Sequence, residues 1–208
     1  MMPKLFIALV CLTFIFTTAG PNSGATITTA LYVDSNRDWS NASNVASSND
    51  TYATIAAVQT DDFSYYIKVT NFGFSIPGGA TVDGIKVEWE RYSDAQVFVE
   101  DDLSATSERV VKGGTITGTN LATGTTWPSS DTYQAYGGAT ELWGLSWSAS
   151  DINASTFGAA GCVFNAGNNA LTTAYVDHCR ITIYYTEAAS NVKKKVIGYG
   201  GHTEIERL

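Results

Sequence analysis

Residues 127–185 decide the fold and read WPSSDTYQAYGGATELWGLSWSASDINASTFGAAGCVFNAGNNALTTAYVDHCRITIYY. Apolar and small or polar side chains alternate along 141–147 and again along 178–185. A period of two places one set of side chains on the core face of a sheet and the other set on the outer face. Turn-forming residues separate these runs, at 136–138, 150–153 and 166–169. The segment therefore predicts a run of antiparallel strands.

Several short motifs in and around this segment together resemble one family. They are FSIPGGATVDGIKVE at 74–88, RVVKGGTITGTN at 109–120, WP at 127–128, YGG at 136–138, LWGLSW at 142–147, DIN at 151–153 and VDHCRITIYY at 176–185. In these motifs the chain is similar to uncharacterised β-sandwich domains of tailed-phage virion proteins and secreted bacterial proteins. The resemblance implies a jelly-roll-like sandwich, and it brings no catalytic motif with it.

Composition agrees with an all-β protein. The 208 residues are 44% hydrophobic and only 15% charged, and they include 19 Gly and 11 Tyr. Such a chain can bury one good core, and its many turn-forming residues are typical of short strands. Further strands are expected at 26–33, 52–59, 64–70, 81–91, 96–99 and 108–111. We therefore expect an all-β, two-sheet antiparallel β-sandwich, jelly-roll-like, over residues 26–187.

The ends of the chain differ from its middle. Residues 1–19 hold Lys4, an apolar run at 5–16 and small residues at 17–19, which is the pattern of a secretory signal peptide. Residues 188–208 hold three adjacent lysines and three glycines, and we expect a tail outside the sandwich, solvated or used to dock on a partner. The expected location is extracellular: secreted, on the cell surface or on a virion.

Charge limits the partners of the chain. The net charge is −8, and the body is acidic while the tail is basic. Nucleic acids and anionic membranes attract clustered Lys and Arg, so we expect neither as a partner once the signal peptide is gone. A protein assembly or a glycan remains, and a homo-oligomer is left open.

Two cysteines lie outside the leader, Cys162 and Cys179. An even pair in an exported chain permits one disulfide, and we expect the two residues on neighbouring strands. The alternative is a pair of buried thiols, because each cysteine lies where an alternating strand expects an apolar residue.

Groups that could carry catalysis are few. The chain has two histidines, no Gly-x-Ser-x-Gly elbow and no zinc-like cluster of His and Cys. His178 directly follows Asp177 and is expected to form a surface pair with it. The acidic runs 61–62 and 100–102 lack the spacing of a calcium loop, and solvated turns are expected there. We therefore expect no enzyme, no cofactor and no metal.

Aromatic side chains are the richest candidates for contact with a ligand. Trp39 lies in a polar loop without alternating neighbours, where it either closes the end of the sandwich or presents its ring to a ligand. Trp127, Tyr133 and Tyr136 lie in a connection rich in Pro, Ser and Gly. Exposed rings stack on sugars and anchor protein interfaces, so these four residues are candidate contact sites. For any single one of them core filling is the more common role, and for Trp39 closure of the sandwich end is the favoured interpretation.

Two functions remain open from the sequence. The first, which the family resemblance and the lack of catalytic groups favour, is a non-enzymatic structural or decorating protein of an extracellular assembly (capsid, tail or surface layer), above all a phage virion. The second is a secreted carbohydrate-binding or adhesive module, favoured by the sandwich fold and the loop aromatics.

Overall fold

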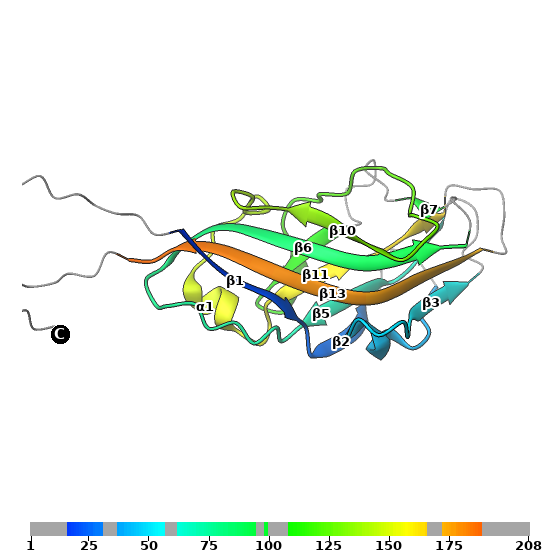
Figure 1. The fold of residues 1–208 in the computed structure, drawn as a ribbon, viewed down its shortest axis with the longest axis horizontal. Coiled ribbons are helices and arrows are strands. Elements are labelled where there is room, and N and C mark those ends of the chain that lie inside the picture. The colour runs from blue at the N-terminus through cyan, green and yellow to red at the C-terminus, as the bar shows by residue number, and fades with distance from the viewer. Residues whose placement is uncertain are drawn as a thin grey trace, which may run out of the picture.

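The chain is an antiparallel β-sandwich, which confirms the expected fold class. The computed structural model describes residues 16–30, 37–56, 62–94, 98–99, 108–165 and 172–188. Two five-stranded sheets and one small three-stranded sheet make up its strands. Figure 1 shows the layers, with β1, β13, β6 and β10 in front of β5 and β11.

Sheet A has the order β1-β13-β6-β10, and β3 pairs with the remaining part of β13. Its strands are β1 (Phe16–Ser23), β3 (Ala53–Ala56), β6 (Thr81–Ser93), β10 (Thr132–Gly137) and β13 (Thr173–Thr186). The two longest strands, β6 and β13, pair along almost their whole length. Their alternation is the one expected from the sequence: Val87, Trp89 and Ile181 face the core.

Sheet B lies behind it in the order β2-β5-β11-β8-β9. Its strands are β2 (Thr26–Ala30), β5 (Tyr66–Thr70), β8 (Glu108–Lys112), β9 (Thr115–Thr117) and β11 (Gly158–Gly161). Gly158 is required at the β11–β5 pairing, because a Cβ atom there would lie 1.9 Å from the carbonyl oxygen of Val69.

Shorter elements complete the fold. Sheet C joins β4 (Asp62–Phe63), β12 (Phe164–Asn165) and β7 (Phe98–Val99). A 3-10 helix, η1, spans Ala42–Val45, and helix α1 spans Ala149–Asn153. Ser148 and Asp151 form a capping box at the start of α1, so the turn expected at 150–153 is a short α-helix.

The stretch 141–147 is not a strand, and the prediction there was wrong. It is a series of turns in which both Trp143 (φ 58°) and Gly144 (φ 67°) have left-handed backbones. An extended strand cannot contain two successive residues of that kind. Leu142, Leu145 and Trp147 also pack on the core, so side chains of both parities touch it. The apparent alternation came from a coiled segment with apolar residues on several sides.

Trp143 of this segment is nevertheless a core residue. Trp143, Ile181 and Ile183 are fully buried in the central core, and Trp147 packs against it while remaining partly exposed. The indole of Trp143 donates to the carbonyl oxygen of Ile85 (3.1 Å). A turn can therefore deliver a core tryptophan as effectively as a strand.

The sandwich includes residues before its expected start at 26. Strand β1 pairs with β13 through Phe16↔Thr186 to Ala19↔Ile183. Cleavage of the expected leader after Ala19 would remove the four residues 16–19, which pair with β13. Whether the leader is cleaved stays a prediction. Residues 1–15 and 189–208, and so most of the expected leader and tail, lie outside the described residues. Within the described ranges, no helix is both long and apolar enough to cross a bilayer.

The two cysteines do not lie on neighbouring strands, contrary to expectation. Cys162 directly follows β11 of sheet B and packs in a small apolar cluster with Tyr66, Val111 and Ala160. Cys179 lies in the middle of β13 of sheet A, within the central core. Both are buried, and no disulfide joins them. Each fills a buried position as an aliphatic residue would, which is the alternative that the sequence left open.

Candidate functional site

The outer face of sheet A, which points away from sheet B, gathers the aromatic and polar side chains of the strands. Alternation along β6 places Lys86, Glu88, Glu90 and Tyr92 on this face while their neighbours enter the core. Paired positions on β13 and β10 add further residues to it. With strands about 4.8 Å apart and about 3.4 Å per residue, the polar area measures roughly 14 Å across and 20 Å along the strands.

Three tyrosines form a cluster at one end of this face, called here the tyrosine cluster: Tyr52, Tyr92 and Tyr175. Tyr92 and Tyr175 are directly opposite one another on β6 and β13, and their rings stack with centroids 4.4 Å apart. Tyr52, just before β3, lies edge-on to both rings, at 5.3 and 5.7 Å. All three remain half-exposed. The rings hold one another in place, so their free surface is preorganised.

A chain of hydrogen bonds crosses the centre of the face. His178 on β13 bonds Ser23 of β1 through Nε2 (2.7 Å) and Tyr133 of β10 through Nδ1 (2.8 Å). Tyr133 is half-exposed, whereas His178 is only 6% exposed. His178 and Asp177 are thus both buried and form no surface pair, because a bulge between Val176 and His178 draws Asp177 into the fold.

Charged side chains continue the network beside Tyr133. The Arg180 guanidinium lies over the Tyr133 ring at 3.7 Å and donates to both carboxylate oxygens of Glu88 (3.1 and 3.2 Å). Lys86 adds a second ion pair to Glu88 at 3.1 Å. Burial raises the pKa of Glu88, but the hydrogen bonds from Arg180 and Lys86 outweigh it and hold that pKa below its usual value. Glu88 is therefore ionised at neutral pH.

His178 is expected to make the folded chain less stable as pH falls below about 6.5, the ordinary pKa of histidine. Burial lowers the pKa of His178 in the fold, and Arg180 lowers it further, against the raising effect of Glu90 and Asp177. The unfolded chain then binds the proton first, so protonation favours unfolding.

The measurement is the melting temperature between about pH 7.5 and pH 5, for the wild type and for His178→Gln. The glutamine keeps hydrogen-bonding groups but does not titrate, so its melting temperature should decline less on acidification. Equal declines in both proteins would show that His178 does not cause the acid sensitivity.

Carboxylates also meet at the tyrosine-cluster end of sheet A. Asp50, Asp131 and Asp177 each place one carboxylate oxygen within 4.8 Å of the others, an arrangement that could hold a metal ion. Of the acidic runs weighed from the sequence, residues 61 and 100–102 lie outside the described residues.

The structure places three of the four expected contact residues inside the sandwich. Trp39, Trp127 and Tyr136 are at most 6% exposed, so their ring faces are turned away from solvent. Trp39 donates its indole N–H to the carbonyl oxygen of Tyr65 (2.8 Å), as a residue that closes the end of the sandwich. Tyr133 alone of the four lies on the outer face of sheet A.

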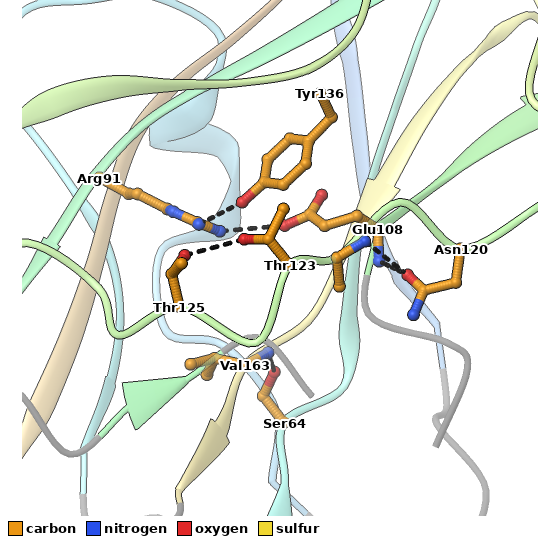
Figure 2. A network of polar contacts seen from close by, with 9 residues as sticks. Ser64, Arg91, Glu108, Asn120, Thr123, Thr125, Tyr136 and Val163 are labelled. Atoms are coloured by element: carbon orange, nitrogen blue, oxygen red, sulfur yellow. Dashed lines mark hydrogen bonds and ion pairs between the residues drawn. The ribbon is translucent and has the colours of Figure 1, made fainter. Parts of the chain in front are cut away.

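Figure 2 shows the buried ion pair of Arg91 and Glu108 with Tyr136 beside it, and Trp39 and Trp127 line the small cavity that adjoins this pair. Arg91 of β6 contacts Glu108 of β8 at 2.9 Å and is hydrogen-bonded to the Tyr136 hydroxyl. Its guanidinium lies 4.3 Å from the centre of the Trp127 ring. The adjoining cavity of about 10 Å³ has room for about one water molecule. This network links the two sheets, and no ligand larger than a water molecule fits in the cavity beside it.

An open groove of about 360 Å³ runs beside β10, the outer strand of sheet A. It is lined by Leu121, Thr123, Ala135, Tyr136, Gly137, Gly138, Thr140 and Glu141. Its single aromatic residue, Tyr136, is 3% exposed. One carboxylate oxygen of Glu141 already accepts a hydrogen bond from the backbone N–H of Trp143. The groove is therefore poorer in binding groups than the outer face of sheet A.

Most residues of the outer face of sheet A were not identified from the sequence. A signal was present, because Lys86, Glu88 and Glu90 mark a solvated face of β6 and Tyr92 continues the same parity. Tyr175 and Arg180 joined them only through the pairing of β13 with β6. Tyr52 reached the cluster through β3, which pairs at the other side of β13.

Comparison with known proteins gives only distant likenesses. No protein-family model matches the chain, and no curated protein matches it. Among solved structures, one described as "CBM4 structure and function" has a TM-score of 0.35 and 12% identity, over 68% of this chain and 87% of that one. A family 29 carbohydrate-binding module from Piromyces equi also has a TM-score of 0.35 and 12% identity, over 85% of this chain and 94% of that one. These likenesses are too distant to carry an argument about function.

Proposed function

We propose that this chain is a non-catalytic binding module that holds a glycan on the outer face of sheet A. The observation that carries the proposal is the combination, on one sheet face, of half-exposed tyrosine rings with a fixed network of charged and hydroxyl groups. Glycans present apolar C–H faces, which stack on aromatic rings, and many hydroxyls, which need donors and acceptors.

The face supplies both kinds of contact in a preformed arrangement. The tyrosine cluster offers ring surface at one end, while the partly exposed Arg180 and Lys86 side chains offer donors farther along the strands. Because these side chains are already fixed by stacking and ion pairs, binding would cost little side-chain entropy. The acidic body does not oppose the binding of a neutral glycan.

The alternative, a component of a phage particle or surface layer, rests on the sequence resemblance alone. Glycan binding draws instead on specific side chains of the fold, and for this reason we prefer it. A functional signal peptide at residues 1–19 would export such a module from the cell, where it could bind extracellular polysaccharides.

The proposal is tested first with the wild-type chain against a panel of polysaccharides that includes cellulose, xylan, mannan, mixed-linkage glucan and chitin. Affinity electrophoresis and pull-down with insoluble polysaccharides would detect binding without assuming which sugar is recognised. Retardation or retention by at least one member is expected. Failure to bind any of them would count against the proposed function.

With a binding polysaccharide in hand, Tyr92→Ala is expected to weaken affinity about ten-fold, as measured by calorimetry. A stacked aromatic contact contributes about 0.5–1.5 kcal/mol beyond its buried area, and 1.4 kcal/mol is ten-fold in affinity. Tyr184→Ala is the matched control: Tyr184 is a half-exposed tyrosine of β13 at the far end of the same face. If Tyr184→Ala weakened binding and Tyr92→Ala did not, the tyrosine cluster would not be the binding site.

A further inference from the structure

We propose that Asp50, Asp131 and Asp177 together bind one divalent cation with the chemistry of Ca²⁺. The site lies at the tyrosine-cluster end of sheet A, and the inference does not rest on the proposed function. The first observation is geometric: one carboxylate oxygen from each residue lies within 4.8 Å of the others. Two ligands of a Ca²⁺ ion, each 2.3–2.6 Å from it, are at most about 5 Å apart. The three oxygens therefore fit around one ion.

Three separate elements bring these carboxylates together. Asp50 lies in the loop before β3 with a left-handed backbone (φ 58°), Asp131 immediately precedes β10, and Asp177 occupies the bulge in β13. The Asp177 carboxylate also fixes the loop, because its Oδ2 accepts hydrogen bonds from the amides of Asn49 (3.0 Å) and Asp50 (3.2 Å). The bulge and the loop are thus locked to one another beside the start of β10.

The second, independent observation is that two buried carboxylate oxygens in this cluster lack partners. Asp177 is 1% exposed, and its Oδ1 has no hydrogen-bond partner; the same holds for the buried Oδ1 of Asp131. A buried charged oxygen without a partner is unfavourable by several kcal/mol in an apolar surrounding. A cation between the carboxylates would supply the missing partner for both.

No basic side chain supplies that partner within the described ranges. The ion pairs found there join Lys86 and Arg180 to Glu88, Arg91 to Glu108, and Lys112 to Asp151. Instead, Glu90 adds a further negative charge near Asp131. Like charges this close attract a cation.

The ligand set selects the kind of cation. All three side chains offer hard carboxylate oxygens, which suit Ca²⁺ and disfavour soft metals. His178 is adjacent in sequence to Asp177, but both of its ring nitrogens are engaged, by Tyr133 and Ser23. Mg²⁺ requires shorter distances and near-octahedral geometry, which loosely spaced carboxylates from three elements serve less well.

The test uses the full chain freed of metal with EDTA and then titrated with CaCl₂. The melting temperature should rise by about 5 °C or more once Ca²⁺ exceeds its dissociation constant about a hundred-fold. Terbium ions should give luminescence sensitised by Tyr52, whose hydroxyl donates to Asp131 at 3.0 Å, and excess Ca²⁺ should quench it. Absence of both signals in the wild type would overturn the proposal.

Three variants locate the site. Asp50→Asn changes an exposed residue and cannot compromise the core; Asp131→Asn removes a half-buried carboxylate. Both should lose the Ca²⁺-dependent rise in melting temperature and the terbium signal, and Asp131→Asn in EDTA should melt no lower than the wild type, because repulsion is relieved. Asp94→Asn, an exposed acid near the tyrosine cluster but outside the carboxylate set, should respond like the wild type. Wild-type responses in both Asp50→Asn and Asp131→Asn would place the ion elsewhere.

Discussion

Glu108→Ala is expected to lower the free energy of unfolding by about 3–5 kcal/mol, measured by urea denaturation. Glu108 and Arg91 form an ion pair at 2.9 Å, and both side chains are 2% exposed. Removing the carboxylate leaves the Arg91 charge inside the sandwich, where water cannot compensate it. The pair joins β6 of sheet A to β8 of sheet B, so the loss acts at the interface of the two sheets (Figure 2).

Two controls separate this effect from a general sensitivity to charge removal. Lys86→Ala breaks an ion pair whose lysine side chain is 29% exposed, and it should cost less than about 1 kcal/mol. The double variant Arg91→Met with Glu108→Leu should recover most of the stability lost by Glu108→Ala, since an apolar pair of similar volume is often as stable as a buried ion pair. A loss for Glu108→Ala no larger than that for Lys86→Ala would contradict the assignment.

Trp143→Ala is expected to destabilise the chain by about 3–5 kcal/mol, the range for emptying a buried tryptophan site. For a domain of this size the melting temperature should fall by about 6 °C or more. Trp143 is fully buried, its indole donates to Ile85, and its carbonyl oxygen accepts from Thr119 (2.8 Å). The ring therefore holds the turn at 141–147 against β6 and the segment after β9.

Trp147→Ala is the matched control, because it removes the same ring from the same segment. Trp147 is partly exposed and donates to the carbonyl oxygen of Leu142 at 3.0 Å, so a smaller cavity results and the loss should be clearly less than for Trp143. Equal losses at the two positions would show that burial of the ring does not set the cost.

Much of the fold could be predicted from local pattern. The alternation of Ile85, Val87 and Trp89 identified β6, and that of Cys179, Ile181 and Ile183 identified β13; these two strands form the centre of sheet A. The same pattern at 141–147 gave a false strand, because alternation reports where apolar residues occur and not the backbone angles between them. The left-handed backbone of Trp143 could not be predicted from such a pattern.

The candidate site was much less predictable. Trp39, Trp127 and Tyr136 were candidates for ligand contact because no clear alternation surrounds them, yet Trp39 and Trp127 fold inward from connections and Tyr136 is an inward-facing residue of β10. Conversely, Tyr52 and Tyr92 stand in or beside strands and still keep ring surface at the solvent face. Whether a ring is exposed depends on what packs over it, which is a property of distant segments.

The sequence by itself determined the fold class. Strand periodicity, turn chemistry and composition are local properties, which can be recognised in each segment without knowing its partners. Only the tertiary structure decided which charges meet: Arg91 with Glu108 between the sheets, and Asp50, Asp131 and Asp177 at the tyrosine-cluster end of sheet A. The physical reason is that electrostatic interactions act over a few ångströms in space and are indifferent to separation along the chain. The order of the strands and the β-bulge between Val176 and His178 placed these charged groups within that range, and no local sequence pattern specified either feature.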